Sequence, residues 1–467
     1  MKSKDSLMKN TLLLSMGTFL TKGLSFIMVP FFSKWLSTAE YGSFDLMATY
    51  VTLLLPLIGL ASNEAVFRFS MEAESEQEKS KYISNSLIIF SINSCLLLCV
   101  MIVAKLVFDW EMAFCFFVLA IGEIFNLHLR GFLRAIKHLD IYSFVSAVIT
   151  VFIAVFTTIL IKVFGLGLEG MLLGYGFGYI SGNIIIVCIT KYWTYVSFRY
   201  ISFSVMKGLV SYSYALIPNS LAWWFINVSD RTIINLILGA ASNGIYAIAY
   251  KIPNILSAVF SVFSVSWQQS ATEVLNDKKR DIYYNSVYNK MIAILLGLCC
   301  GVLSLNSWLF NYIFDERYYS GYVYAPILIA GTVFATLSQF YGSLQISFKQ
   351  PKENGISTVI GAVSNLIIHL ALVYFIGLYA AAISTVLSQI VVCWIRHIRL
   401  KKLVVLRVSS STIAMYIVYL YFTVAAYFIS NNLFNILNVL LATAVVMVVV
   451  RDFLVKIVKK MKKVIAE

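Results

Sequence analysis

Fourteen apolar runs, most of them about 20 residues long, fill the sequence and decide what the chain can fold into. Only 12% of the residues are charged, whereas a soluble domain contains roughly 25%. The runs are longer than core helices and lack the alternation of barrel strands, so we predict an all-α integral membrane protein. The predicted spans are residues 10 to 32, 44 to 64, 83 to 104, 112 to 129, 141 to 163, 168 to 190, 208 to 238, 243 to 265, 286 to 311, 322 to 346, 355 to 375, 378 to 395, 411 to 429 and 433 to 455.

The basic residues are concentrated in every second connection between the runs. These connections and the two termini contain 29 of the 36 Lys and Arg residues, and the opposite connections contain five. Because cytoplasmic loops of membrane proteins carry the excess of Lys and Arg, this distribution predicts that both termini are cytoplasmic. The net charge of +14 follows from the same bias, so we expect no nucleic-acid partner.

Several classes of protein are excluded by what the sequence lacks. It contains no GxxxxGK[ST] motif for a nucleotide's phosphates, and its seven cysteines lie within apolar runs without metal-ligand spacing. We therefore expect no metal and no cofactor, only H⁺ or Na⁺ as a possible coupling ion. The connections opposite to the basic ones are too short to fold alone, which argues against a membrane polysaccharide polymerase. These features favour a transporter over an enzyme.

An internal repeat relates the two halves of the chain. A shift of 202 residues aligns LSTAEYGSF (36 to 44) with LGAASNGIY (238 to 246), so that Gly42 meets Gly244. Because the shift spans an even number of helices, the two copies are parallel, as in many transporters. We predict a six-helix lobe over residues 1 to 200, a second over 201 to 400, and two further helices with a basic tail over 401 to 467.

Three segments resemble a known family. SDRTIINLILGAASNGIYAIAYKIP (229 to 253), STAEYGSFDLMATYV (37 to 51) followed by EAVFRF (64 to 69), and RGFLRAIKHLDIYSF (130 to 144) are similar to polysaccharide-repeat flippases of the Wzx type. These flippases belong to the multidrug/oligosaccharidyl-lipid/polysaccharide superfamily, whose fold is MATE-like. The resemblance covers the whole chain, and the Asp-Arg pair followed by Gly-x-Tyr and Tyr-Lys is its most specific part.

The resemblance implies an activity, a location and partners. The substrate would be an undecaprenyl-pyrophosphate-linked oligosaccharide, moved from the cytoplasmic to the outer leaflet of the bacterial inner membrane by alternating access. The pathway would be O-antigen (lipopolysaccharide) or capsule biosynthesis, with a polysaccharide polymerase and a chain-length regulator as partners and a monomeric flippase. The alternative within the superfamily is a cation-coupled multidrug exporter, in which acidic cavity residues should outnumber basic ones.

Three cations within or beside the spans are candidates for binding the substrate. Lys22 lies near the middle of the first run, Arg231 in the outer part of the seventh, and Lys251 in the eighth. A charge within a span costs about 2.5 to 3.5 kcal/mol on insertion scales, so it usually faces a cavity or a partner. The resemblance puts these helices around a central cleft, where three cations would suit a pyrophosphate. Each also has a structural reading, as a partner within its lobe, a helix cap or a snorkelling side chain.

Two acidic residues are candidates for ion coupling. Glu123 is in the middle of the fourth run, and Asp230 precedes Arg231. A buried carboxylate that binds a proton or Na⁺ in one state only is the minimum device for coupling to a gradient. For Glu123, a structural partnership with a Lys or hydroxyl is equally compatible with the sequence. Adjacent residues on a helix point about 100° apart, so Asp230 and Arg231 cannot pair face to face.

Other residues suggest local structure. Four prolines interrupt predicted spans and are candidate hinges, namely Pro56, Pro218, Pro253 and Pro326. The cluster Trp223, Trp224 and Phe225 would either stack on sugar rings or anchor the span at the interface or in lipid. Glu64 and Arg68, four residues apart, are expected to form an ion pair.

Overall fold

The protein is helical throughout the part that can be described. The computed structural model describes residues 21 to 60, 62 to 428 and 432 to 466, and all regular elements in these ranges are helices. Eleven of the helices found there are long and apolar enough to cross a membrane. The predicted all-α membrane fold is therefore confirmed. The total of 14 spans stays a prediction, and most of the first predicted span lies outside the described residues.

The chain divides into two compact units, Met1–Gly244 (unit 1) and Ile245–Glu467 (unit 2). The division falls near the start of helix α9, not at residue 200. Helix α8, which the sequence repeat assigns to the second lobe, groups with unit 1 because it packs against α2, α3 and α4. The two six-helix lobes and the two added helices stay a prediction.

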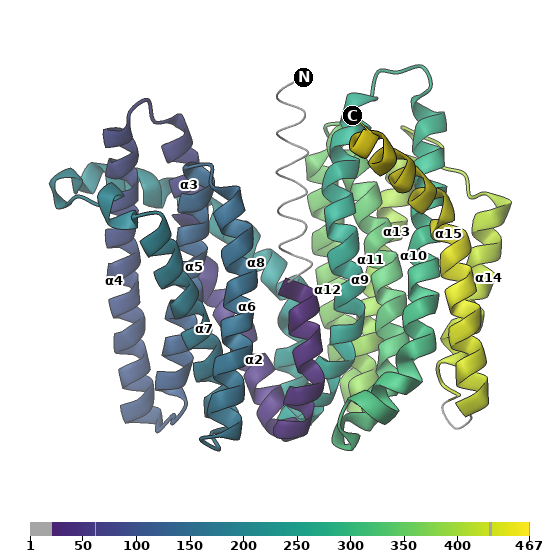
Figure 1. The fold of residues 1–467 in the computed structure, drawn as a ribbon, viewed down its shortest axis with the longest axis horizontal. Coiled ribbons are helices and arrows are strands. Elements are labelled where there is room, and N and C mark those ends of the chain that lie inside the picture. The colour runs from purple at the N-terminus through teal and green to yellow at the C-terminus, as the bar shows by residue number, and fades with distance from the viewer. Residues whose placement is uncertain (1–20, 61, 429–431, 467) are drawn as a thin grey trace. The chain divides into compact units, whose positions relative to one another are not determined.

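Among its described residues, unit 1 contains a helix over residues 21 to 35 and seven further helices. Figure 1 shows their course. Two 3₁₀ turns, η1 and η2, connect α7 to α8. The elements are α2 (Thr38–Ile58), α3 (Ser62–Glu72), α4 (Glu76–Phe108), α5 (Ala113–Ala135), α6 (Leu139–Lys162), α7 (Gly167–Ile189), η1 (Tyr192–Tyr195), η2 (Phe198–Tyr200) and α8 (Phe203–Leu238).

The described residues of unit 2 contain seven α-helices, one π-helical turn and one short 3₁₀ helix. The last two helices, α14 and α15, pack on α10. The elements are α9 (Ala240–Glu273), α10 (Arg280–Trp308), η3 (Leu309–Ile313), η4 (Glu316–Val323), α11 (Tyr324–Ser347), α12 (Pro351–Ile376), α13 (Leu378–Leu400), α14 (Ser410–Ala425) and α15 (Asn432–Ala466).

Helix α2 begins six residues before the predicted span because its first turn is polar. Ser37 is the N-cap of a capping box: its hydroxyl accepts from the Glu40 amide at 3.2 Å, and the Glu40 carboxylate accepts from the Ser37 amide at 2.8 Å. These bonds satisfy two amides that the helix start leaves open. The helix therefore starts on its cap, ahead of the apolar residues that marked the predicted span.

The second predicted span is two helices instead of one. Helix α2 ends at Ile58, and α3 begins at Ser62 after Leu60, which has a left-handed φ of 46°. The Asn93 side-chain amide on α4 donates to the Ile58 carbonyl at 2.8 Å and so satisfies a backbone group that the break exposes. Pro56 lies two residues before the end of α2, so the chain changes direction just after this proline.

Glycines let α7 pack very closely on α6. A Cβ atom on Gly174 would lie 2.6 Å from the Thr157 Cα, and one on Gly178 would lie 2.8 Å from the Ile153 amide nitrogen. On the other side of α7, a Cβ on Gly176 would lie 3.0 Å from the Leu119 amide nitrogen of α5. Small residues that allow backbones to approach are the usual means of helix association in membranes.

The predicted repeat is visible in the packing. The closest-packed helix pairs are α6 with α7 and α5 with α7 in unit 1, and their equivalents α12 with α13 and α11 with α13 in unit 2. Gly42 and Gly244, which the 202-residue shift aligns, also meet each other. A Cβ on Gly42 would clash with the Ala240 carbonyl, and one on Gly244 with the carbonyl of Thr38, the residue that aligns with Ala240.

A clasped segment follows α7 in unit 1 and α13 in unit 2. The unit 1 strap, residues 190 to 202, is held by Asn85 of α4, whose side chain donates to the Tyr200 carbonyl and accepts from the Ser202 amide, both at 2.8 Å. The unit 2 strap, residues 401 to 409, is held in the same way by Asn285 and Asn289 of α10, the equivalent of α4.

Unit 2 contains a buried cation, Arg396, that binds only neutral oxygens in the contacts seen among the described residues. Its guanidinium donates to the Ser338 carbonyl at 2.7 Å, the Ser357 hydroxyl at 2.9 Å and the Thr358 hydroxyl at 2.7 Å. These groups lie on α11 and α12, while Arg396 lies on α13. Since a buried guanidinium requires its donors to be satisfied, this residue links the three helices.

Candidate functional site

The clearest charged contact inside unit 1 joins α2 to α8. The Arg231 Nε donates to the Asp45 carboxylate at 2.7 Å, and the two side chains are only 11% and 13% exposed. The sequence analysis identified Arg231 but missed Asp45. The available signal was a lone acid eight residues after the Ser37 cap, within an apolar helix. Its partner is too distant in the sequence for spacing to reveal the pair.

Asp230 and Arg231 lie within α8, not in a connecting loop. They are 7% and 9% exposed, so the predicted position inside a long helix is confirmed. The alternative, a surface cap at the end of the span, is wrong for Arg231. Because the two residues are adjacent, their side chains leave the helix in different directions.

Lys22 and Lys251, the two lysines predicted to bind the substrate, lie in different units. In unit 1, Lys22 is in the first described turn of the helix over residues 21 to 35, and its side chain is exposed. In unit 2, Lys251 lies on α9 two residues before Pro253 and is partly buried. The predicted grouping of both lysines with Arg231 stays a proposal.

Glu123 lies on α5 within a group of polar side chains. The Tyr179 hydroxyl of α7 donates to its carboxylate, and Arg130, two turns along α5, is close enough to interact electrostatically with it. Tyr175, one turn from Tyr179, lies near both Asp45 and Glu123. These groups place titratable side chains along α5 and α7, from Glu123 toward the Asp45–Arg231 pair, within one unit.

Two expected local arrangements are wrong. Glu64 binds Arg134 of α5 at 2.8 Å, and Arg68 binds Glu72 at 2.6 Å, so the predicted pair of Glu64 with Arg68 does not form. Pro326 is the third residue of α11, in the first turn, where a proline removes no helical hydrogen bond. Pro326 therefore does not interrupt the helix, contrary to the prediction from the sequence.

The remaining prolines and the aromatic cluster have these positions. Pro253 lies inside α9, and α8 continues through position 218. Trp224 is buried: its indole nitrogen donates to the Thr49 carbonyl of α2 at 3.0 Å. Trp224 thus joins α8 to α2. The side chains of Trp223 and Phe225 lie outside the described part.

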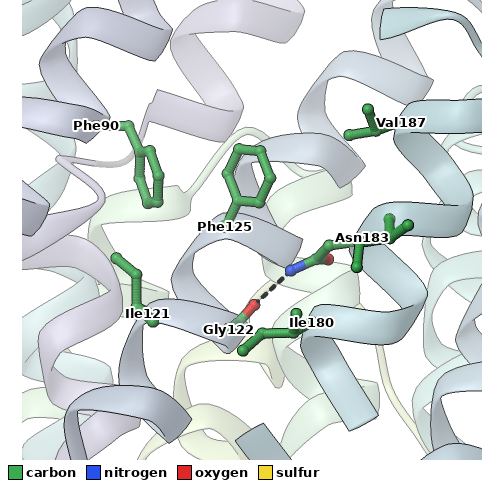
Figure 2. A pocket seen from close by; sticks show the side chains of 8 residues that line it. Phe90, Ile121, Gly122, Phe125, Ile180, Asn183 and Val187 are labelled. Carbon is green, nitrogen blue, oxygen red and sulfur yellow. Dashed lines mark hydrogen bonds between the residues drawn. The ribbon is translucent and has the colours of Figure 1, made fainter. Parts of the chain in front are cut away.

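Unit 1 also contains an apolar pocket between α4, α5 and α7, with a volume of about 240 Å³. Figure 2 shows its one polar side chain, Asn183, donating to the Gly122 carbonyl at 2.8 Å. The Asn183 oxygen accepts from Asn126, also at 2.8 Å. With this amide already bonded, the pocket suits hydrocarbon and offers little to a polar ligand. It is lined by Phe90, Ile121, Gly122, Phe125, Ile180, Asn183, Ile184 and Val187.

Apolar spans with ionisable side chains buried inside them are typical of membrane transporters. The chain belongs to the polysaccharide biosynthesis protein family, whose model matches residues 7–268. It is also similar to a probable low-salt glycan biosynthesis flippase of Haloferax volcanii. The two are 24% identical over 192 residues, which are 40% of this chain and 40% of that protein.

Two solved structures share the fold over most of the chain. Lipid II flippase MurJ, in an inward closed conformation, superposes with a TM-score of 0.75 at 14% identity, covering 96% of this chain and 100% of that one. An inward-facing multidrug resistance MATE family transporter of the MOP superfamily has a TM-score of 0.63 at 15% identity, covering 84% and 95%. The family resemblance inferred from the sequence is therefore confirmed.

Proposed function

We propose that the protein is a flippase that moves a lipid-linked oligosaccharide across the membrane in polysaccharide biosynthesis. The observation that carries the proposal is the family match over residues 7–268, in a chain with the fold of a lipid II flippase. The finer proposal is an undecaprenyl-pyrophosphate carrier, moved from the cytoplasmic to the outer leaflet for O-antigen or capsule synthesis. A polymerase and a chain-length regulator would use the product.

Lys22, Arg231 and Lys251 are proposed to bind the pyrophosphate. Cations bind phosphate oxygens through charge-assisted hydrogen bonds, and the planar guanidinium of Arg231 suits two oxygens at once. Because Arg231 is bound to Asp45 at 2.7 Å, a pyrophosphate that uses this guanidinium has to compete with a carboxylate. The two lysines would supply compact positive charges.

The proposal is tested by measuring flipping of a fluorescent lipid-linked oligosaccharide in vesicles that contain the purified protein. Lys22→Ala and Lys251→Ala should each abolish flipping, and the corresponding arginine variants should retain part of it, because the positive charge is kept. Lys105→Ala, at the exposed end of α4, is the matched control and should flip normally. Normal flipping by both alanine variants would remove the lysines from the mechanism, and no flipping by wild type would refute the function.

Coupling to a gradient is proposed to use Glu123, with Asp230 as the second candidate. Glu123 is bonded to Tyr179 and lies near Arg130, so a change in its protonation would alter contacts between α5 and α7. In the same vesicles, Glu123→Gln should lose stimulation by an imposed pH or Na⁺ gradient while downhill exchange of substrate continues. Equal stimulation of wild type and variant would exclude Glu123 as the coupling group.

A multidrug exporter is the second candidate function, favoured by the fold shared with MATE transporters. The sequence argument against it was that cations outnumber acids in the spans. The structure weakens that argument, because it adds Asp45 to Asp230 and Glu123. The number of acidic candidates then equals the number of cationic ones. Energy-dependent export of a cationic dye from cells, abolished by Asp45→Asn, would support this candidate.

A further inference from the structure

The unit 1 strap exposes large aromatic side chains from a segment that is firmly held. Trp193 is 56% exposed and Phe198 is 79% exposed, and Phe203, which directly follows the strap as the first residue of α8, is 78% exposed. Together these exposed aromatic side chains form an apolar patch, which a loop that faces only water would not normally have. The strap backbone lies at the end of unit 1 where α3 turns into α4 (Figure 1).

Alternate aromatic residues of the strap point inward and fix it. Tyr192 is buried, bonds the His128 ring at 3.0 Å through its hydroxyl, and packs edge-on against Phe132 at 4.8 Å. The Tyr195 ring also contacts the Phe132 ring, with 5.2 Å between the ring centroids. Together with the Asn85 bonds and the Ser197 amide, which donates to the Ser84 hydroxyl at 2.9 Å, these contacts hold the backbone in one path. The outward aromatic residues are therefore presented by a rigid support.

The unit 1 strap and the start of α8 carry only positive charge. Lys191, Arg199 and Lys207 are all exposed, and residues 190 to 213 contain no Asp or Glu. Exposed aromatic rings beside the ends of membrane spans are stable at the level of the lipid headgroups, where one side is apolar and the other wet. Lys and Arg at that level attract anionic lipids. The attraction decreases with distance from the membrane surface and is largely screened beyond one Debye length.

We propose that the unit 1 strap and the start of α8 lie in the headgroup layer and bind anionic phospholipid, with Trp193, Phe198 and Phe203 inserted and Lys191, Arg199 and Lys207 on the phosphates. The strap continues directly into α8, the helix that carries Asp230 and Arg231. Bound lipid would therefore anchor the start of that helix. The proposal does not depend on the transported substrate.

The unit 2 strap provides a natural comparison. It carries three cations, Lys401, Lys402 and Arg407, whereas the unit 1 strap carries Lys191 and Arg199 and is followed by Lys207 on α8. Asparagines clasp the two straps in the same way. Its exposed apolar residues, however, are Val405 and Val408, at 51% and 44% exposure, and it has no aromatic residue. The two straps are therefore both basic and differ in aromatic content.

The test uses the full chain in nanodiscs and the fluorescence of Trp193, taken as the difference between wild type and Trp193→Phe. Lipids brominated near the headgroup should quench this signal, and brominated phosphatidylglycerol should quench it more than brominated phosphatidylcholine at equal content. Each of Lys191→Gln, Arg199→Gln and Lys207→Gln should reduce the preference for phosphatidylglycerol about fivefold, as expected for one cation at an anionic surface. Quenching by brominated phosphatidylcholine should remain.

Matched controls distinguish bound lipid from water around Trp193 and from free phosphate on the cations. Lys401→Gln, Lys402→Gln and Arg407→Gln should leave the Trp193 signal unchanged, and inorganic phosphate should not displace the lipid. Quenching of Trp193 by aqueous iodide, and not by brominated lipid, would overturn the insertion. Equal quenching by the two brominated lipids, or displacement by inorganic phosphate, would overturn the binding of anionic phospholipid.

Discussion

At the scale of single residues, the Asp45–Arg231 pair is the contact in unit 1 whose loss should reduce stability most. Both partners are nearly buried, so removing one breaks a charged contact that is largely shielded from water. The pair connects α2 to α8, and Trp224 connects the same two helices through the Thr49 carbonyl. A substrate phosphate that took Arg231 would therefore act on a contact that also holds the helices together.

Removal of either partner should destabilise the protein strongly. We expect Arg231→Ala and Asp45→Ala each to cost roughly 3 to 5 kcal/mol, as for other buried pairs that lose one charge. The double variant should cost less than the sum, because each single variant already breaks the pair. Thermal unfolding in detergent measures this, with Arg68→Ala, from an exposed pair, as the control that should change little. Additive losses in the double variant would show that the pair is not coupled.

The residue scale also shows where sequence reasoning reaches its limit. Glu64 and Arg68 have ideal helical spacing, yet Glu64 binds Arg134, because α3 and α5 pack closely and bring the two together. Asp45 escaped notice because its partner is far away in the sequence. In contrast, the position of Asp230 and Arg231 within a long helix was predicted correctly, since it follows from the repeat.

At the scale of helices, the apolar runs predicted the elements well and their ends poorly. Each predicted span with described residues corresponds to helix, but α2 starts on its polar cap and stops at Ile58. The break at Leu60 depends on a left-handed backbone and on Asn93 of a neighbouring helix, which hydrophobicity does not report. The close packing of α7 likewise depends on which glycines face which helix.

The α7 glycines should tolerate alanine to different degrees, depending on what lies opposite. Gly174→Ala should be severe, since the added methyl meets the backbone of Thr157 at 2.6 Å, which cannot move alone. Gly182→Ala should be milder, because the added methyl meets only the Ile149 side chain, where it would overlap with Cγ1 and lie 2.7 Å from Cδ1, and a side chain can change rotamer where a backbone cannot move alone.

Thermal unfolding of the purified variants ranks the two substitutions. Gly208→Ala on α8 is the control: nothing lies within 4 Å of its would-be Cβ, and alanine favours a helix by roughly 0.5 to 1 kcal/mol. Equal losses at positions 174 and 182 would mean that α6 shifts as a whole to accommodate either methyl group.

At the scale of the whole molecule, the charge distribution predicts the orientation in the membrane. If both termini are cytoplasmic, the connection between α9 and α10 is also cytoplasmic and η4 is external. In a cysteine-free background, Arg317→Cys should react with an impermeant maleimide in intact cells. Lys278→Cys should react only after the membrane is permeabilised. The reverse pattern would invert the topology and place the unit 1 strap in the other leaflet.

The contact between Gly42 and Gly244 bears on how such a chain can evolve. A Cβ atom on Gly42 would clash with the Ala240 carbonyl, and one on Gly244 would clash with the Thr38 carbonyl. A two-fold dimer shows the same reciprocity, because one surface there meets an identical copy of itself. In a dimer of identical halves, any substitution at this position would appear on both sides of the contact at once, so its steric cost would be doubled. Joining the halves in one gene removes that doubling, and from then on each glycine answers to selection separately.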